Sequence, residues 1–223
     1  MWLDEGGYDE YRIERRFSEW ERAGWAESKA DNPALDTPNR YGVRRSVLRD
    51  AEAERVRGGG WDLPLLQRVV DQFVLHYDAS GTSRRCFARL HDDRGLSVHC
   101  MLDLDGTIYQ TLDLKERAWH TTHANSRSSG IEISNIGAYP DAKAERLREW
   151  YTTDRHGQTT MIIPADAKDA FMRTTGFVAR PDRSEPVCGL IHGEEFHQFD
   201  FTPEQYEALI KLTATLGAVF HGD

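Results

Sequence analysis

The stretch LSVHCMLDLDGTIYQTLDL, residues 96–114, decides the fold class of this chain. Two runs rich in apolar and β-branched residues, 96–104 and 107–114, flank the dipeptide Asp105-Gly106. An Asp-Gly pair between two such runs is a strong signal for a β-hairpin, because its residues accept the positive φ angles of a tight turn. We therefore expect two antiparallel strands here.

Strands and helices alternate on both sides of this hairpin. The run VVDQFVL, 69–75, predicts a buried strand that ends at His76, and residues 82–90 suit a helix. GIEISNI, 130–136, predicts a further strand. Interleaved helices and strands around an antiparallel hairpin predict an α/β or α+β fold, with a single mixed central sheet flanked by helices.

The last segment carries the start signals of a helix. Thr202 is placed to be the N-cap, Pro203 the first helical residue, and Gln205 the residue that completes a capping box. Apolar residues then recur at helical spacing as far as Phe220. We expect an amphipathic helix over 203–220.

The first sixty residues differ from the rest in composition. Segment 8–29 mixes charged and aromatic residues at helical spacing, and the charged stretch 44–57 suggests a second short helix. We expect a helical N-terminal extension, 1–60, which either caps the main domain or acts as a binding arm. The main domain, 61–223, holds an insertion of loops and short elements at about 140–200.

Composition excludes several classes of protein. The chain has 223 residues and a formal net charge of −9, which argues against a nucleic-acid partner. No apolar run reaches the roughly 18 residues of a membrane helix. The N-terminus has no secretory signal as written, so we expect a cytoplasmic protein, or a periplasmic or extracellular one if the N-terminus is incomplete.

Three cysteines, Cys86, Cys100 and Cys188, are too few and too scattered for a disulfide framework or a CxxC zinc knuckle. We expect them to be small buried residues or free thiols.

Two residues stand out as candidates for chemistry. His76 stands at the end of a predicted buried strand, so the sheet would fix its backbone while its ring faces a cleft, as a zinc ligand requires. A structural role is the alternative. Glu132 lies within an apolar strand, where a carboxylate costs several kcal/mol unless it is paired or hydrated. It is either a general base beside a metal or an exposed residue on the polar face of the strand.

Four stretches together resemble the zinc-dependent N-acetylmuramoyl-L-alanine amidase family, whose fold peptidoglycan recognition proteins share. They are VLHYDAS (74–80), LSVHCMLDLDGTIYQTLDLKERAWH (96–120), NSRSSGIEISNIGAY (125–139) and FTPEQYEALIKL (201–212). The resemblance covers roughly 69–139 and 201–220, and leaves the N-terminal extension and the insertion outside it.

The resemblance implies roles for particular residues. His76 matches the first zinc ligand, and Glu132 matches the carboxylate that activates water in one branch of the family. Trp119, His120 and Asn125 match residues that line the cleft and are expected to contact the substrate or order the site. Core packing is the alternative for Trp119 and His120.

Another branch of the family uses a tyrosine where this chain has Val98, which places the chain in the glutamate branch. The implied cofactor is Zn²⁺, and the implied substrate is peptidoglycan or a muropeptide. Zinc would polarise the carbonyl of the amide between the muramoyl lactyl group and L-alanine, and Glu132 would help to deprotonate the attacking water. A domain that binds muropeptides without cutting them is the alternative. A third hypothesis, an interaction protein acting through the N-terminal helix, rests on composition alone.

The remaining ligands of the family follow the last helix, as a histidine and, about ten residues later, an aspartate or cysteine. Here the chain reads Phe220-His221-Gly222-Asp223, which matches only the first part faintly, so the resemblance implies a truncated sequence. We expect weak zinc binding and little hydrolysis from this chain. A site rebuilt from His76 with His192 or His197 is an alternative, and His120 and His123 have HxxH spacing.

Overall fold

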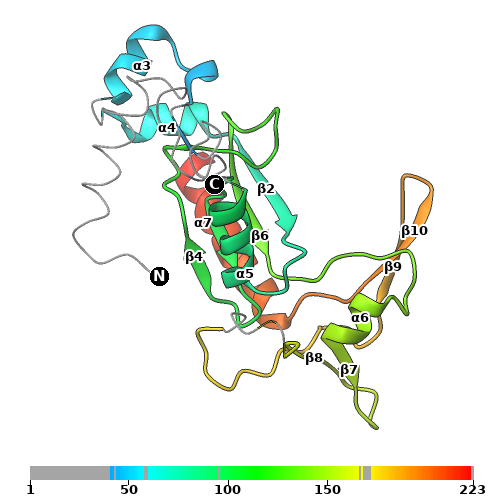
Figure 1. Ribbon diagram of the computed structural model, residues 1–223. Helices are drawn as coiled ribbons and strands as arrows, with labels where there is room; N and C mark the ends of the chain where they lie inside the picture. Colours follow the sequence, from blue (N-terminus) through cyan, green and yellow to red (C-terminus); the bar gives the residue numbers. More distant parts are fainter. Residues whose placement is uncertain are drawn as a thin grey trace. The chain divides into compact units, whose positions relative to one another are not determined.

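A mixed β-sheet carries the candidate site in the computed structural model (Figure 1). Its four strands lie in the order β2 (Gln72–Tyr77), β6 (Ser128–Ile133), β3 (Cys100–Leu102) and β4 (Ile108–Gln110). β3 is parallel to β6 and antiparallel to β4. The predicted fold class, a mixed central sheet flanked by helices, is confirmed.

The structure describes residues 41–42, 44–57, 60–94, 96–165, 167 and 172–221. The helix expected over 8–29 lies outside these residues. Within the stretch 44–57, a 3-10 helix covers Arg45–Val47 and helix α3 covers Asp50–Arg57, as the charge pattern suggested. Among the described helices, none combines the length and apolar character needed to cross a membrane.

The predicted hairpin is confirmed as β3 and β4. Leu102 pairs with Ile108, and the Asp103 N–H donates to the Thr107 carbonyl at 2.9 Å. Gly106 has a φ of +78°, and a Cβ on it would lie 2.9 Å from the Glu204 carbonyl oxygen. Both the turn and the close approach of a second backbone therefore require glycine here. The strands are shorter than the sequence pattern predicted.

The predicted strand at 69–75 is wrong at its start. Residues Leu63–Val69 form helix α4 instead, because the Asp62 side chain caps it by accepting the Leu65 N–H at 2.9 Å, and Pro64 suits its first turn. Val69 is therefore a buried residue of the helix, and Val70 ends it in an extended conformation. Strand β2 begins only at Gln72 and ends at Tyr77, one residue beyond the predicted end at His76. None of its residues is fully buried, so the prediction of a buried strand is wrong.

Helix α7, Pro203–His221, is confirmed with its capping box. The Thr202 hydroxyl accepts the Gln205 N–H at 3.1 Å, and the Gln205 side chain accepts the Thr202 N–H at 2.9 Å. The same two side chains donate to carbonyls next to the sheet, Thr202 to Leu104 at 2.7 Å and Gln205 to Ser134 at 2.8 Å. These bonds fix α7 (red in Figure 1), which packs against β3.

Short elements fill the segment predicted as an insertion. They are helix α6 (Glu145–Trp150) and strands β7 (Tyr151–Thr153), β8 (Thr159–Met161), β9 (Val187–Ile191) and β10 (Glu194–Gln198). β7 pairs with β8, and β9 with β10, as two antiparallel hairpins. Trp150, fully buried, lies in an apolar core with Ile136, Leu147 and Phe199.

The chain divides into two compact units. One comprises residues 1–74, 90–99 and 112–129; the other comprises 75–89, 100–111 and 130–223. The first also contains the pair β1 (Tyr41–Gly42) and β5 (Arg117–Ala118), and helix α5 (Ser83–Phe87) belongs to the second. The π-helix Ala88–Asp93 follows α5, so the helix predicted at 82–90 is present as an α-helix that continues into a π-helix.

Candidate active site

His76 and Glu132 belong to the same unit and lie on neighbouring strands, β2 and β6. The N–H of Asp71 donates to the Arg127 carbonyl and the N–H of Asp78 to the Ile133 carbonyl, each at 3.0 Å, so β2 and β6 run parallel. In a parallel pair, a residue that donates to the carbonyl of residue j−1 lies opposite residue j, so Asp71 lies opposite Ser128 and Asp78 opposite Ser134. The two registers differ by one residue, which means that β2 holds one extra residue between these bonds. Counted back from Asp78, the nearer of the two, the register places His76 opposite Glu132. Facing residues project from the same side of a sheet, and the strands are about 4.8 Å apart.

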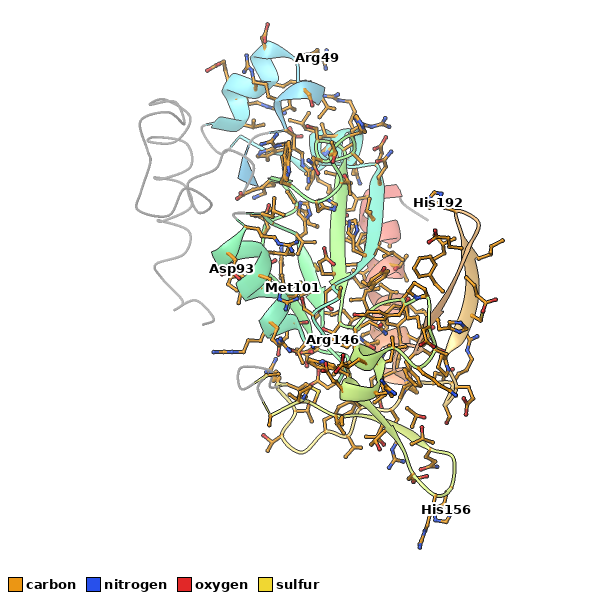
Figure 2. All side chains as sticks on the ribbon, turned by 45° about the vertical axis from the view of Figure 1, so that its right-hand side comes forward. Arg49, Asp93, Met101, Arg146, His156 and His192 are labelled. Carbon is orange, nitrogen blue, oxygen red and sulfur yellow. The ribbon has the colours of Figure 1, made fainter. Side chains whose placement is uncertain are left out.

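The alternation along β6 leaves Glu132 accessible. The other five residues of β6 are buried, and Glu132 is half-buried. Ile131 and Ile133, 0% and 4% exposed, point to the opposite face of the sheet. Glu132 pairs in register with Met101 of β3, labelled in Figure 2. The glutamate therefore stands on the same face as a buried apolar residue.

Burial controls the protonation of both candidate residues. The pKa of Glu132 is raised to about 8, mainly by burial and in addition by the charge of Asp78. Without a cation nearby, the carboxyl is therefore mostly protonated at pH 7; a bound cation would oppose this. Burial lowers the pKa of His76, so its imidazole is neutral at pH 7 and offers the lone pair that a metal ligand requires.

Asp78, which the sequence reasoning missed, organises the end of β2. Its Oδ1 accepts the backbone N–H groups of Ser80 at 2.8 Å, Gly81 at 3.1 Å and Asn135 at 3.1 Å. Its Oδ2 is buried and has no hydrogen-bond partner within the described part of the chain. Burial raises the pKa of Asp78 to about 7, although the three N–H donors act against the shift. The sequence did offer one signal for Asp78: it lies two residues after His76, and side chains two apart along an extended chain share a face.

The side chains around His76 match a zinc site only in part. A neutral half-buried imidazole fits the chemistry of a zinc ligand. Over the described residues, however, His76 does not belong to a set of three potential ligands whose donor atoms lie within 4.8 Å of one another. His192 lies in the turn of the β9–β10 hairpin, as Figure 2 shows, and neither it nor His197 is grouped with His76.

Asn125 lies in the other unit and closes a tight turn. Its Oδ1 accepts the N–H groups of His120 at 2.9 Å and Thr121 at 2.8 Å. The residue is 2% exposed, and its Nδ2 is buried without a hydrogen-bond partner among the residues described. The amide oxygen is thus committed to holding the chain at His120.

Trp119 and His120 are partly buried and ordered by their neighbours. The Trp119 N–H donates to the Ser97 hydroxyl at 3.0 Å, and the Arg117 guanidinium lies 5.3 Å from the centre of the indole. His120 Nε2 is hydrogen-bonded to the Ser128 hydroxyl at 3.1 Å. These contacts fit a residue that lines a site as well as one that packs, so the predicted contact with substrate stays a prediction.

Arg44 is the second residue that sequence reasoning missed. Fully buried, it donates to the carbonyls of Leu114 at 2.8 Å, Ser128 at 3.0 Å and Asn125 at 3.3 Å. Burial, and then the charge of Arg117, lowers its pKa to about 9, so it remains a cation at pH 7. Arg44 thereby ties the chain just before the 3-10 helix Arg45–Val47 to the turn that carries Asn125.

Comparison with known families agrees with the sequence motifs. The family model described as N-acetylmuramoyl-L-alanine amidase matches residues 66–175. The matched segment includes His76 and Glu132, together with the turn from Trp119 to Asn125. A comparison with curated proteins gave no match. The resemblance to the amidase family is confirmed for residues 69–139. The match also takes in residues 140–175, which the sequence motifs left outside the resemblance, and it does not reach 201–220.

Proposed function

We propose that the segment 66–175, which matches the N-acetylmuramoyl-L-alanine amidase family, forms a site that hydrolyses the amide between the N-acetylmuramoyl lactyl group and L-alanine in peptidoglycan or muropeptides. One observation carries the proposal. His76 and Glu132 lie on neighbouring parallel strands within the segment that matches the family, and the register counted from the Asp78–Ile133 hydrogen bond places them opposite each other.

Glu132 has the properties of a general base for this reaction. A base works best when its pKa lies near the operating pH, and the pKa of Glu132 is about 8. The carboxylate would take a proton from water as the water oxygen attacks the amide carbonyl. The C–N bond then breaks, and the same proton passes from Glu132 to the departing amine of L-alanine.

The family implies zinc, for which His76 is the candidate ligand at this site. When bound, zinc supplies Lewis acidity and lowers the pKa of its water. A catalytic zinc needs three protein ligands, and the described residues around His76 do not supply that set. We therefore expect zinc to bind weakly at His76 in this chain and hydrolysis to be slow.

A muropeptide-binding domain without hydrolysis is the second candidate, and the incomplete set of ligands around His76 favours it. Glu132 argues for hydrolysis, since binding alone gives no reason to bury a carboxyl group with so high a pKa.

The two candidates separate in one experiment. The full chain is incubated with excess zinc and N-acetylmuramoyl-L-alanyl-D-isoglutamine, and the dipeptide with a free alanine amine is measured by mass spectrometry. Glu132→Gln is the test variant, and Glu185→Gln, at an exposed position, is the matched control. Release that is lost only in the Glu132 variant supports hydrolysis. Binding without release supports the second candidate. If the chain shows no binding and no release, the proposal is overturned.

A further inference from the structure

The β9–β10 hairpin presents a set of potential metal ligands distant in sequence from the candidate active site. Two residues, His192 and Gly193, connect the strands with φ angles of +51° and +87°. Positive φ at both central residues makes this a type I′ turn, which matches the natural twist of a hairpin and fixes the register of its strands. Figure 2 shows His192 at the tip.

The register brings three ligand side chains onto one face. His197 of β10 lies directly opposite Cys188 of β9. Glu195 lies two residues before His197, and side chains two apart along a strand share a face. The donor atoms of these three side chains lie within 4.8 Å of one another, and His197 Nε2 is 3.2 Å from Glu195 Oε1.

We propose that Cys188, Glu195 and His197 bind a zinc ion, with water in the fourth position. Tetrahedral zinc with bonds of 2.0–2.3 Å holds its ligand atoms about 3.5 Å apart. The donor atoms thus need to approach one another by about 1.3 Å at most. Cys188 and Glu195 are both exposed, which leaves room for their side chains to rotate.

The backbone under His197 is held in place before any metal binds. Beyond its pairing with β9, His197 exchanges two hydrogen bonds with Tyr139: its N–H donates to the Tyr139 carbonyl at 2.7 Å, and its carbonyl accepts the Tyr139 N–H at 2.9 Å. The other face of the hairpin, with Val187 and Phe196, lines a hollow of about 270 Å³. The ligand face is therefore separate from this hollow.

The donor set favours zinc over the other common divalent ions. A thiolate is a poor ligand for Mg²⁺ and Ca²⁺, which prefer oxygen, whereas zinc accepts sulfur, nitrogen and oxygen together. Cys188 would lose its thiol proton to solvent on binding, so affinity should rise with pH. Because two ligands are exposed, the fourth position stays open to water.

Cobalt(II) substitution tests this site separately from His76. The metal-free, reduced full chain is titrated with Co²⁺, since a thiolate bound to cobalt gives a sulfur-to-metal charge-transfer band and His76 has no cysteine among its proposed ligands. We expect one equivalent of Co²⁺ to give this band, and Zn²⁺ to displace it. Cys188→Ser should abolish the band and weaken zinc binding by more than about 100-fold, beyond the loss typical of removing an outer-shell partner.

Matched variants make each outcome decisive. His156→Ala, in the turn of the β7–β8 hairpin, and His76→Ala should both keep the band. His197→Ala should lose it, with circular dichroism used to show that the fold is retained. No band in the wild-type chain, or a full band in Cys188→Ser, overturns the proposal. If His76→Ala loses zinc binding while Cys188→Ser and His197→Ala keep it, the zinc binds at the proposed amidase site and the hairpin proposal is overturned.

Discussion

Counted from the Asp78–Ile133 hydrogen bond, His76 lies opposite Glu132 on two parallel strands, although the whole β3–β4 hairpin separates them in the chain. A neutral imidazole and a carboxyl of raised pKa thus share one face of the sheet. This placement depends on one register: a slip of β2 by a single residue would move His76 to the other face.

Replacing Glu132 separates binding from rate. We expect Glu132→Gln to lower the turnover number by about 10²–10⁴-fold, because it removes a general base. The dissociation constant for the muramoyl peptide should stay within a factor of about three, since the amide keeps the shape of the side chain. Single-turnover kinetics and calorimetry measure the two quantities. Equal turnover by the variant and the wild type would show that Glu132 is not the base.

Asp78 should contribute to stability through its three backbone donors. Asp78→Ala leaves the N–H groups of Ser80, Gly81 and Asn135 without this acceptor, so we expect the free energy of unfolding to fall by about 1–3 kcal/mol. Asp78→Asn keeps an oxygen in place and should lose less. Urea denaturation measures both variants, and equal losses would contradict the role of the acceptor.

Asp103 should make stability depend on pH. Burial raises its pKa from 3.8 to about 6, so between these values the folded protein binds more protons than the unfolded chain. Stability from this group is therefore complete below about pH 4 and is lost as the pH rises through 6. Asp103→Asn should flatten the profile by about 2–3 kcal/mol between pH 4 and 7, at about 1.36 kcal/mol per pKa unit.

Urea denaturation of the wild type and Asp103→Asn at about pH 4 and pH 7 measures how much the unfolding free energy of each protein changes with pH. Asp182→Asn, at an exposed position, is the control for removing a carboxylate. The same pH slope in wild type and Asp103→Asn would contradict the prediction.

Arg44 should be essential to the unit that holds Asn125. Arg44→Met removes the donor to three carbonyls while keeping much of the buried volume, so we expect a loss of about 3 kcal/mol in unfolding free energy. Hydrogen exchange should become faster in the turn around Asn125. Arg45→Met, at a neighbouring side chain that is 55% exposed, should change neither quantity. Equal effects of both substitutions would contradict this role.

Local patterns predicted the elements whose signals lie within a few residues. The Asp105-Gly106 turn and the capping box of Thr202 and Gln205 are both present, since turn geometry and helix caps depend on neighbours in the chain. The error at 69–75 has the same origin: a short apolar run does not distinguish the end of a buried helix from a strand. The Asp62 cap and Pro64 were the signals that decided it.

Contacts between distant residues were not predictable in this way. Nothing near Arg44 in the sequence indicates that its guanidinium reaches the carbonyls of Leu114 and Ser128. The cysteines also differ in a way that spacing does not reveal: Cys86 and Cys100 are buried, as expected, whereas Cys188 is exposed beside Glu195 and His197.

By itself, the sequence predicted the class of fold, the resemblance of residues 69–139 to the amidase family, and His76 and Glu132 as candidate site residues, because motif spacing and alternation are properties of the chain. Only the tertiary structure decided which groups share a face: Glu132 with His76, and Cys188 with His197. Strand register sets those pairings, and it arises from hydrogen bonds between segments far apart in the chain. The tertiary structure also decided the raised pKa values of Glu132 and Asp78, since burial is a property of the packed molecule.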